Sequence, residues 1–510
     1  MGTKSNKVVF KPYIQNQIQL LPPSLDELVE AKHPCRIVNE VIEKIDIRPI
    51  NRKYKGGGAS SYHPRLLLKV LVYGYLTNTY SSRKLEEQVK QNIYFMWLCG
   101  MKTPDHNTIN RFRSEKLSGI LREIFSQIVL LLAEEGVVSL KEAVYTDGTK
   151  IESVANKYTF VWGKSIKSSK DRIKAQLDEL WKYAQGIAAD ELKDINPSSF
   201  EQINAEKVKE TVARIEKALE DKPVSKKVKQ KLSYAKKSWP ANLERYDEQE
   251  KKLAGRNSYS KNDTDATFMR MKEDHMLNGQ LKPAYNWQIS TQDQFILNYS
   301  LHQTSNDSQT LASHLDRYEA LYQQKPVAVV ADAGYGSDEN YSLLKEKEIE
   351  AYIKYNYFDK EQKEGIKAFS NDTLHYNQQQ NCLVCPMGQT MRHIGDYTRT
   401  TATGYKQIVS RYQAANCNGC PMRGVCHNGK GNRIAEVNHQ LRKHKQEAKE
   451  RLNTEQGIKY RKRRPADVEP VFAQIKHNHG FRRFLLKGLT KTEVEIGLLS
   501  IAHNLRKWEA

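Results

Sequence analysis

The stretch Val327-Ala-Val-Val-Ala-Asp332-Ala-Gly-Tyr-Gly336 joins a short β-prone run to an aspartate and a glycine-containing turn. A second stretch, Val144-Tyr-Thr-Asp147-Gly-Thr-Lys150, has the same form. Short apolar runs bounded by glycine predict buried strands. We expect each aspartate to end its strand, where rigid backbone at the sheet edge holds the carboxylate. Such carboxylates can bind a metal ion, because Mg²⁺ prefers oxygen ligands.

A third carboxylate lies in the basic segment Tyr460-Arg-Lys-Arg-Arg-Pro-Ala-Asp-Val-Glu469-Pro-Val-Phe-Ala-Gln-Ile-Lys476. Each aspartate by itself fits a turn former or a helix cap equally well. The combination of two strand-end aspartates, a glutamate and basic flanks favours a catalytic site. Three converging carboxylates would hold two Mg²⁺ ions, with Mn²⁺ able to substitute, for chemistry at phosphorus. We therefore predict that Asp147, Asp332 and Glu469 are metal ligands and catalytic residues.

The charge of the chain indicates a polyanionic partner. Its formal net charge is +21 over 510 residues, and its mean hydropathy is −0.72. Residues 456–487 contain nine Lys or Arg against Asp467 and Glu469. A solvated basic face is the alternative interpretation of such a run, but so unbalanced a segment repels itself without a counter-charge. Nucleic acid is the expected partner.

Several motifs resemble those of DDE transposases from bacterial insertion sequences. They are Tyr62-His-Pro-Arg-Leu-Leu-Leu68, Pro104-Asp-His-Asn-Thr-Ile-Asn-Arg-Phe-Arg113, the two aspartate segments, and the ending Gly480-Phe-Arg-Arg-Phe484. The closest likeness is to the group with a Tyr-Arg-Glu-Lys motif around the third carboxylate. The resemblance implies an RNase H-like catalytic core that acts on double-stranded DNA.

The Tyr-Arg-Glu-Lys motif departs from its usual spacing here. Its arginine usually precedes the glutamate by four positions, but position 465 is Pro. The role therefore falls to Arg463 or Arg464. We expect Pro465 in the first turn of a helix, with the arginine before it. Lys476 should lie two turns beyond Glu469 on the same face. The predicted DNA contacts of this motif are Tyr460, Arg463, Arg464 and Lys476.

The N-terminal segment from Pro64 to Glu115 has helical periodicity, interrupted by the turn Lys102-Thr-Pro-Asp-His-Asn. Two short helices joined by a polar turn could form a helix-turn-helix that reads the ends of the element. Asn110, Arg111 and Arg113 are its predicted DNA contacts. The alternative is a helical bundle that only braces the core.

Five of the seven cysteines lie between 382 and 426, in Cys382-Leu-Val-Cys385 and Cys417-Asn-Gly-Cys420-Pro-Met-Arg-Gly-Val-Cys426-His427. Paired Cys-x-x-Cys turns are typical of a structural zinc site. Spacing favours Cys382 over Cys426 as the fourth ligand, with His427 a weaker option. The family resemblance instead implies Cys385, Cys417, Cys420 and Cys426.

The predicted fold class is α/β, with a mixed-sheet RNase H-like core, a long helical insertion, a small zinc-binding insertion and an all-α N-terminal domain. The lysine- and glutamate-rich block between the aspartates supplies the helical insertion. The predicted boundaries are 1–135 for the N-terminal domain, 136–160, 257–357 and 431–510 for the core, 161–256 for the helical insertion and 358–430 for the cysteine-rich insertion.

The resemblance implies cleavage at terminal inverted repeats followed by strand transfer into target DNA, by a homodimer assembled on DNA. The rival interpretations are an inactive, zinc-containing DNA-binding descendant and a stand-alone nuclease. The longest apolar run, residues 124–133, is shorter than the about 20 residues that span a bilayer. The start lacks an apolar signal, and an odd number of cysteines favours a reducing compartment. We expect a bacterial cytoplasmic, nucleoid-associated protein.

Overall fold

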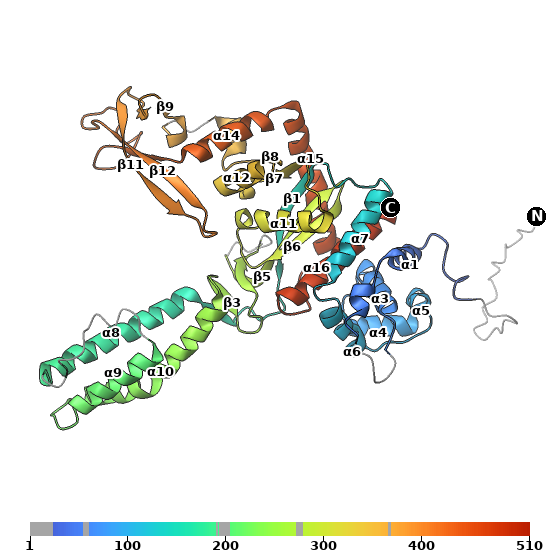
Figure 1. Ribbon diagram of the computed structural model, residues 1–510, viewed down its shortest axis with the longest axis horizontal. Coiled ribbons are helices and arrows are strands. Elements are labelled where there is room, and N and C mark those ends of the chain that lie inside the picture. The colour runs from blue at the N-terminus through green and yellow to red at the C-terminus, as the bar shows by residue number, and fades with distance from the viewer. Residues whose placement is uncertain are drawn as a thin grey trace, which may run out of the picture.

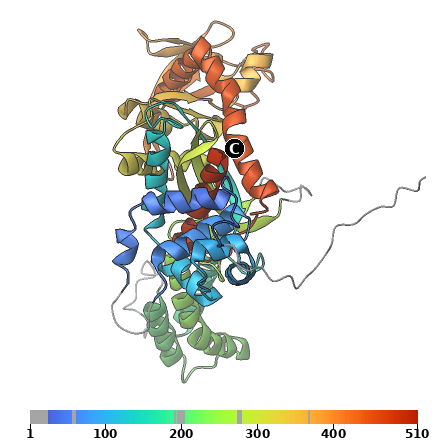
Figure 2. The same cartoon turned by 90° about the vertical axis from the view of Figure 1, so that its right-hand side faces the viewer.

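The computed structural model describes residues 24–54, 61–189, 192, 204–271, 279–365 and 369–509. Parts of every predicted domain therefore lie outside the described residues. Helices combine with a sheet of mixed strand direction, which confirms the predicted α/β class. A helical arm and a second sheet extend from the central sheet in different directions, and both lie away from the N-terminal helices (Figures 1 and 2).

The central sheet has six strands in the described chain. They are β1 (Val144–Glu152), β4 (Thr267–Arg270), β5 (Leu281–Gln292), β6 (Phe295–His302), β7 (Ala328–Ala331) and β8 (Glu350–Ile353). β4 and β6 both pair with β5, followed across the sheet by β1, β7 and β8. β1, β7 and β8 run parallel, whereas β5 is antiparallel to β1, β4 and β6.

β1 has two faces with different neighbours, as the period of two along a strand requires. Tyr145 and Asp147 face the helix α15 (Glu455–Ala473). The rings of Tyr145 and Tyr460 pack edge to face there, with their centroids 6.2 Å apart. On the other face, Thr146 hydrogen-bonds Ser290 at 2.8 Å, and Ser290 reaches His314 of α11 (Leu311–Tyr322).

The prediction that Asp147 ends its strand is wrong, since β1 continues to Glu152. The physical reason lies at the next residue. Gly148 is opposite Gln288 of β5, and a Cβ at Gly148 would lie 2.1 Å from the Gln288 amide nitrogen. The glycine is therefore needed because the Gln288 side chain passes close to the backbone of a continuous strand, and it does not indicate a turn.

The N-terminal helices share one hydrophobic core with the central sheet. Their bounds are α1 (Pro34–Lys44), α2 (Arg48–Asn51), α3 (Pro64–Leu76), α4 (Ser82–Gln91), α5 (Ile93–Cys99), α6 (His106–Arg111), the π-helix η1 (Phe112–Lys116) and α7 (Leu121–Glu134). The C-terminal helix α16 (Leu489–Glu509) packs against α3, α7 and β6 and so joins the two parts.

The helical arm consists of α8 (Gly163–Ile187), α9 (Ala205–Ala218) and α10 (Lys226–Leu253). It leaves the core at the short ladder between β2 (Phe160–Trp162) and β3 (Ser258–Ser260). A separate hydrophobic core, which includes Trp181 and Trp239, holds the arm together. The chain thus forms the long helical insertion that its periodicity predicts.

The cysteine-rich segment forms a second sheet with five strands among the described residues. In sheet order they are β13 (Ile434–Val437), β12 (Lys406–Ala414), β11 (Thr390–Thr400), β10 (Cys382–Val384) and β9 (His375–Asn377). Because β13 pairs with β12, this sheet extends to Val437, beyond the predicted limit at residue 430.

The remaining helices cover the parallel half of the central sheet. They are α12 (Asp338–Glu346), α13 (Phe358–Glu364), α14 (His439–Leu452) and α15, with short helical turns at η4 (Asp307–Gln309) and η5 (Ala333–Tyr335). A further turn, η6 (Asn371–Thr373), lies against β13 of the second sheet. α15 lies against β1, β5, β7 and β8. Among the helices that the structure describes, none has the length and apolarity that crossing a membrane requires.

The prediction that α15 starts near Pro465 is wrong, because the helix begins at Glu455 and contains both Pro465 and Pro470. A proline inside a helix leaves the carbonyl four residues earlier without its usual donor. For Pro470 that carbonyl belongs to Ala466, and the Gln294 side chain donates to it at 3.0 Å. The β5–β6 turn thereby stabilises the interrupted helix.

Candidate functional site

The three predicted carboxylates come from three elements that meet at the parallel edge of the central sheet. Asp147 lies within β1, Asp332 directly follows β7, and Glu469 lies on α15. Their side chains are 9%, 42% and 61% exposed, respectively. The group therefore opens to solvent on the side of Asp332 and Glu469, with Asp147 at its base.

One guanidinium contacts all three carboxylates. Arg464 Nη2 lies 3.1 Å from Asp147 Oδ2 and 3.5 Å from Asp332 Oδ2, and its Nη1 lies 3.8 Å from Glu469 Oε1. The Arg464 side chain is only 12% exposed. The ion pair with the buried Asp147 is screened weakly, whereas solvent screens the pairs with the more exposed Asp332 and Glu469 more strongly.

Backbone amides orient the two aspartates. Asp147 Oδ1 accepts a hydrogen bond from the Gly148 N–H at 2.8 Å, and Asp332 Oδ1 accepts one from the Gly334 N–H at 2.9 Å. The loop after Asp332 passes close to β8, since a Cβ at Gly336 would lie 2.3 Å from the Lys354 carbonyl oxygen. The Gly-Tyr-Gly turn thus fixes the backbone that carries Asp332.

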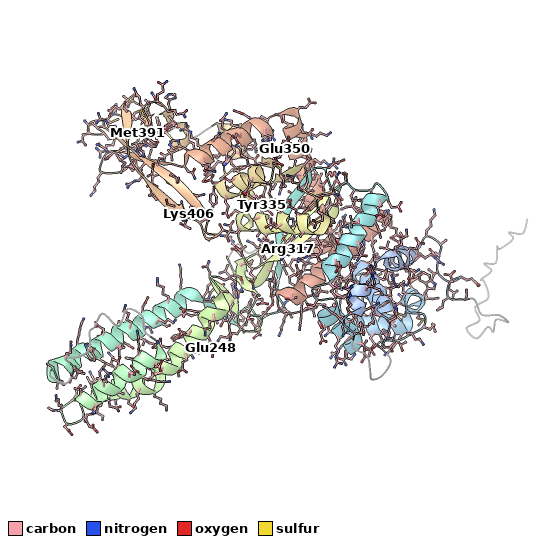
Figure 3. The ribbon with its side chains drawn as sticks, viewed as in Figure 1. Glu248, Arg317, Tyr335, Glu350, Met391 and Lys406 are labelled. Atoms are coloured by element: carbon pink, nitrogen blue, oxygen red, sulfur yellow. The ribbon has the colours of Figure 1, made fainter. Side chains whose placement is uncertain are left out.

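A polar network that the sequence analysis missed lies beneath these acids. Asp307 Oδ1 accepts hydrogen bonds from Asn286 Nδ2 at 2.7 Å and Gln288 Nε2 at 3.0 Å, and Tyr335 donates to Gln288 Oε1. Burial first, and then the charges of Asp307 and Asp147, raise the pKa of Tyr335 well above its ordinary value. Figure 3 labels Tyr335 in the central region. Polar residues at alternate positions of buried β5 were the available signal.

The two candidate arginines lie in different surroundings. Arg463 pairs with Asp293, and its Nε lies 3.5 Å from Asp467 Oδ2, away from the three carboxylates. Tyr460 contacts Tyr352 and Tyr145 with ring centroids 4.8 and 6.2 Å apart. Arg464 is therefore the arginine of this motif that the structure brings to the acids.

Two predicted DNA contacts are buried, and the structure contradicts them. Lys476 is 6% exposed and donates to the Lys150 carbonyl oxygen at 2.9 Å. α15 gives way at residue 474 to the π-helix η7 (Gln474–Asn478), whose wider turns break the expected two-turn stacking on Glu469. Arg113 is 2% exposed and donates to Tyr80 O at 2.7 Å.

The other predicted N-terminal contacts remain at or near the surface. Arg111 is exposed and Asn110 is partly buried at the end of α6. Asn110 Oδ1 accepts a hydrogen bond from Arg113 Nη2 at 3.2 Å. Arg113 thus has a structural role within the bundle, and Arg111 is the member of this set that can reach a ligand.

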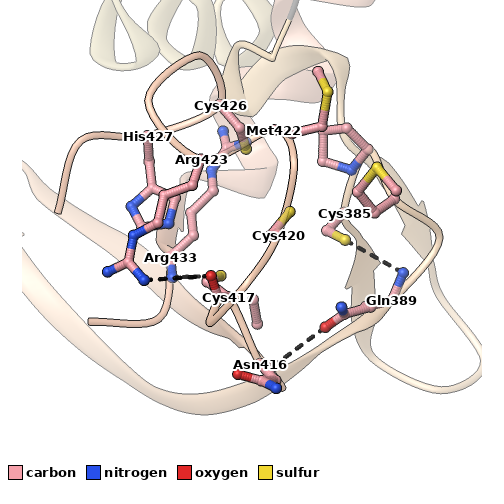
Figure 4. A pocket seen from close by; sticks show the side chains of 13 residues that line it. Cys385, Gln389, Asn416, Cys417, Cys420, Met422, Arg423, Cys426, His427 and Arg433 are labelled. Carbon is pink, nitrogen blue, oxygen red and sulfur yellow. Dashed lines mark hydrogen bonds between the residues drawn. The ribbon is translucent and has the colours of Figure 1, made fainter. Parts of the chain in front are cut away.

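Four cysteines line one pocket at the end of the second sheet (Figure 4). They are Cys385, Cys417, Cys420 and Cys426, joined by His427. Cys382 does not line this pocket, and its thiol donates to Gln380 Oε1 at 3.7 Å. The four cysteines that line the pocket are those implied by the resemblance, and their role as metal ligands stays a prediction.

N–H groups point at these sulfurs. Gln389 N donates to Cys385 Sγ at 3.3 Å, Arg433 N to Cys417 Sγ at 3.4 Å, and Arg433 Nη1 to Cys426 Sγ at 2.9 Å. These hydrogen bonds orient three of the four sulfurs in the pocket. The His427 Nε2 atom is buried without a hydrogen-bond partner in the described chain.

Both clusters contain side chains of the types that bind the predicted metals, although their atoms are not in ligand positions, so the two metal sites stay predictions. Within the residues that the structure describes, no three acidic, His or Cys side chains form a group able to hold a metal ion. The carboxylates already surround a cation and supply the hard oxygen ligands of Mg²⁺. The cysteine pocket supplies the sulfur ligands of Zn²⁺.

Comparisons with known sequences match both ends of the chain. Residues 384–508 match a family described as "Transposase DDE domain", and residues 23–115 match one described as "Transposase domain (DUF772)". The first segment contains Glu469, Arg464 and the cysteine pocket. No curated protein and no solved structure matches the chain.

Proposed function

From the premise that this chain belongs to the DDE transposases, we propose that Asp147, Asp332 and Glu469 form its catalytic centre for cleavage at insertion-sequence ends and strand transfer into target DNA. The observation that carries the proposal is the contact of one guanidinium with all three carboxylates. The order of the sheet, with β5 antiparallel to β1 and β7 and β8 parallel to it, supports an RNase H-like core.

The chemistry consists of two displacements at phosphorus. Water attacks a phosphodiester at the element end, and the leaving 3′ oxygen takes a proton to become a free hydroxyl. That hydroxyl then attacks a target phosphodiester and displaces its 3′ oxygen. Two Mg²⁺ ions bound by the three carboxylates would activate each attacking oxygen and stabilise each leaving oxygen. Asp147 and Asp332, held by backbone amides, fix the position of this chemistry, and Arg464 carries positive charge to the phosphate.

The cysteine pocket has a structural role in this proposal. Cys385, Cys417, Cys420 and Cys426 would hold one Zn²⁺ and close the end of the second sheet. This sheet has a small core of its own, in which Leu383, Met391 and Tyr412 are among the buried residues. A core of that size needs additional stabilisation, which a structural metal provides.

A strand-transfer assay with paired element ends, target DNA and Mg²⁺ separates this proposal from its rivals. We expect cleaved ends and joined products, formed by a dimer assembled on the DNA. Cleavage without joining would instead identify a stand-alone nuclease. Binding of the ends without either reaction would identify an inactive descendant of a transposase.

Replacing Arg464 with Ala is expected to slow cleavage by about 10- to 100-fold, the usual cost of losing a group that orients metal ligands. Arg464→Lys should recover little of this loss, because a single ammonium cannot reach three carboxylates with the geometry of a planar guanidinium. Single-turnover cleavage rates and Mn²⁺ affinity measure the effect.

Arg463→Ala is the matched control for the Arg464 variants, since the two arginines are neighbours on one helix. Arg463 pairs with Asp293 and Asp467 rather than with the predicted catalytic acids. Its loss should leave cleavage within about threefold of the unmodified rate, because Arg463 contacts none of the three predicted catalytic acids and its exposed pair with Asp293 is worth at most about 1 kcal/mol. Equal losses for the two arginines would show that Arg464 has no special place in the site.

A further inference from the structure

The outer half of α10 and the turn before it carry a concentration of lysines that the catalytic centre does not use. Residues 222–243 contain seven lysines and no Asp or Glu. They are Lys222, Lys226, Lys227, Lys229, Lys231, Lys236 and Lys237. Because α10 returns to the core at its C-terminal end beside β3, these lysines lie toward the far end of the arm (Figures 1 and 2).

Part of this set forms one continuous face. Lys226, Gln230, Tyr234 and Lys237 follow one another at intervals of four, four and three residues, which places them on one side of a helix, with Lys227 beside them. Tyr234 is 58% exposed. The side chains that hold α10 in the arm, which include Leu232, Ala235, Trp239 and Leu243, lie on the opposite side. We call Lys226, Lys227, Gln230, Tyr234 and Lys237 the lysine face.

Several other arm lysines pair with acids, whereas those of the lysine face have no such pair among the described residues. Lys231 pairs with Glu179 and Lys236 with Glu216, each at 2.7 Å. Within the described residues, no Asp or Glu forms an ion pair with Lys226, Lys227 or Lys237.

The position of these lysines also opposes the helix dipole. The first turn of α10 has no acidic residue, although the positive end of the dipole favours acids there and disfavours lysines. The arrangement lowers the stability of the arm unless an anion offsets it. A solvated surface without a ligand would not require lysines at this end of the helix.

We propose that the lysine face binds the phosphate backbone of the duplex that enters the catalytic centre, at a distance from the cleaved phosphodiester. This inference rests on the proposed function, because it assumes that DNA is the substrate. The 28 residues of α10 extend about 40 Å, which is comparable to one turn of B-form DNA. Lysines with an exposed tyrosine suit phosphate and sugar, which carry no direct sequence information.

The test compares the affinity of the full chain for two fluorescent duplexes of arbitrary sequence, about one and about four helical turns long. We expect the unmodified protein to bind the longer duplex more tightly. Lys226→Ala/Lys227→Ala/Lys237→Ala should weaken binding of the longer duplex at least about tenfold and lower the salt slope by up to about 3 units. Binding of the short duplex should change less than about twofold, because a duplex of about one turn held at the catalytic centre ends short of the lysine face.

The matched control removes three lysines from the same arm that already have acid partners: Lys182→Ala/Lys209→Ala/Lys231→Ala, whose partners are Asp178, Glu244 and Glu179. The control should keep the preference for the longer duplex, and so should a triple Lys→Arg variant of the lysine face. Thermal unfolding should show no loss of stability when the lysines of the first turn are removed.

Equal losses in the test and control variants, or no length preference in the unmodified protein, would overturn the proposal and leave the proposed function standing. Failure of the unmodified protein to bind either duplex would contradict both. A selective loss for the longer duplex in the lysine-face variant supports the inference.

Discussion

Asp147→Asn is expected to lower DNA cleavage by at least about a thousandfold, a loss of about 4 kcal/mol of transition-state stabilisation. The substitution preserves the shape of a side chain that is 9% exposed and keeps an oxygen for the Gly148 amide. It removes the negative charge that faces Arg464 and that metal binding requires. Asp332→Asn and Glu469→Gln should have the same effect, because one function divided among three acids fails when any one is lost.

DNA binding should survive these substitutions, since the carboxylates hold cations rather than phosphate. Less negative charge beside a phosphate path should increase the affinity for DNA slightly. The measurements are single-turnover cleavage with Mg²⁺ or Mn²⁺, which should both support the reaction, and binding with Ca²⁺, which should support binding alone. Near-normal cleavage by Glu469→Gln would show that the third carboxylate is misassigned.

Asp293→Asn provides a control for the removal of negative charge near α15. Asp293 is an exposed acid that pairs with Arg463 at the β5–β6 turn. Surface pairs of this kind contribute little, at most about 1 kcal/mol. The substitution should therefore leave the cleavage rate nearly unchanged. A decrease as large as that of Asp147→Asn would show that any lost negative charge near α15, rather than a lost metal ligand, slows cleavage.

The sequence could predict the parts of the site that depend on local pattern. A short apolar run followed by Asp-Ala-Gly identified the end of β7, and polar helical periodicity identified the arm. The position of Asp147 inside its strand, rather than at the end, could not be predicted in this way. Whether Asp-Gly ends a strand or continues it depends on the side chain across the sheet, here Gln288, which is 140 residues away in the sequence.

Basic residues were the other source of error in predicting the site from the sequence. A lysine or arginine that donates to buried oxygen atoms has the same local sequence as one that contacts DNA. Lys476 is bound by the Lys150 carbonyl, and Arg113 by Tyr80 and Tyr75. These partners come from distant segments. The helix start predicted from Pro465 was wrong for a related reason. A long helix can contain a proline when its packing on the sheet offsets the lost hydrogen bond.

Cys417→Ser and Cys420→Ser are expected to abolish zinc binding and unfold the second sheet. Elemental analysis should find about one zinc per unmodified chain, as four sulfur ligands predict. Structural zinc sites contribute about 10–16 kcal/mol at neutral pH, which far exceeds what the small core of this sheet can replace. The loss should appear as lower solubility and as early proteolysis in the cysteine-rich segment.

The choice between Cys382 and Cys426 gives this prediction a matched control within the same sheet. Cys426 lines the pocket and accepts a hydrogen bond from Arg433, whereas Cys382 points to Gln380. Cys426→Ser should therefore release the metal and Cys382→Ser should retain it. The reverse result would restore the ligand set favoured by sequence spacing. Full stability and activity of the metal-free protein would remove the structural role of zinc, since the remaining hydrophobic core would then suffice to hold the sheet.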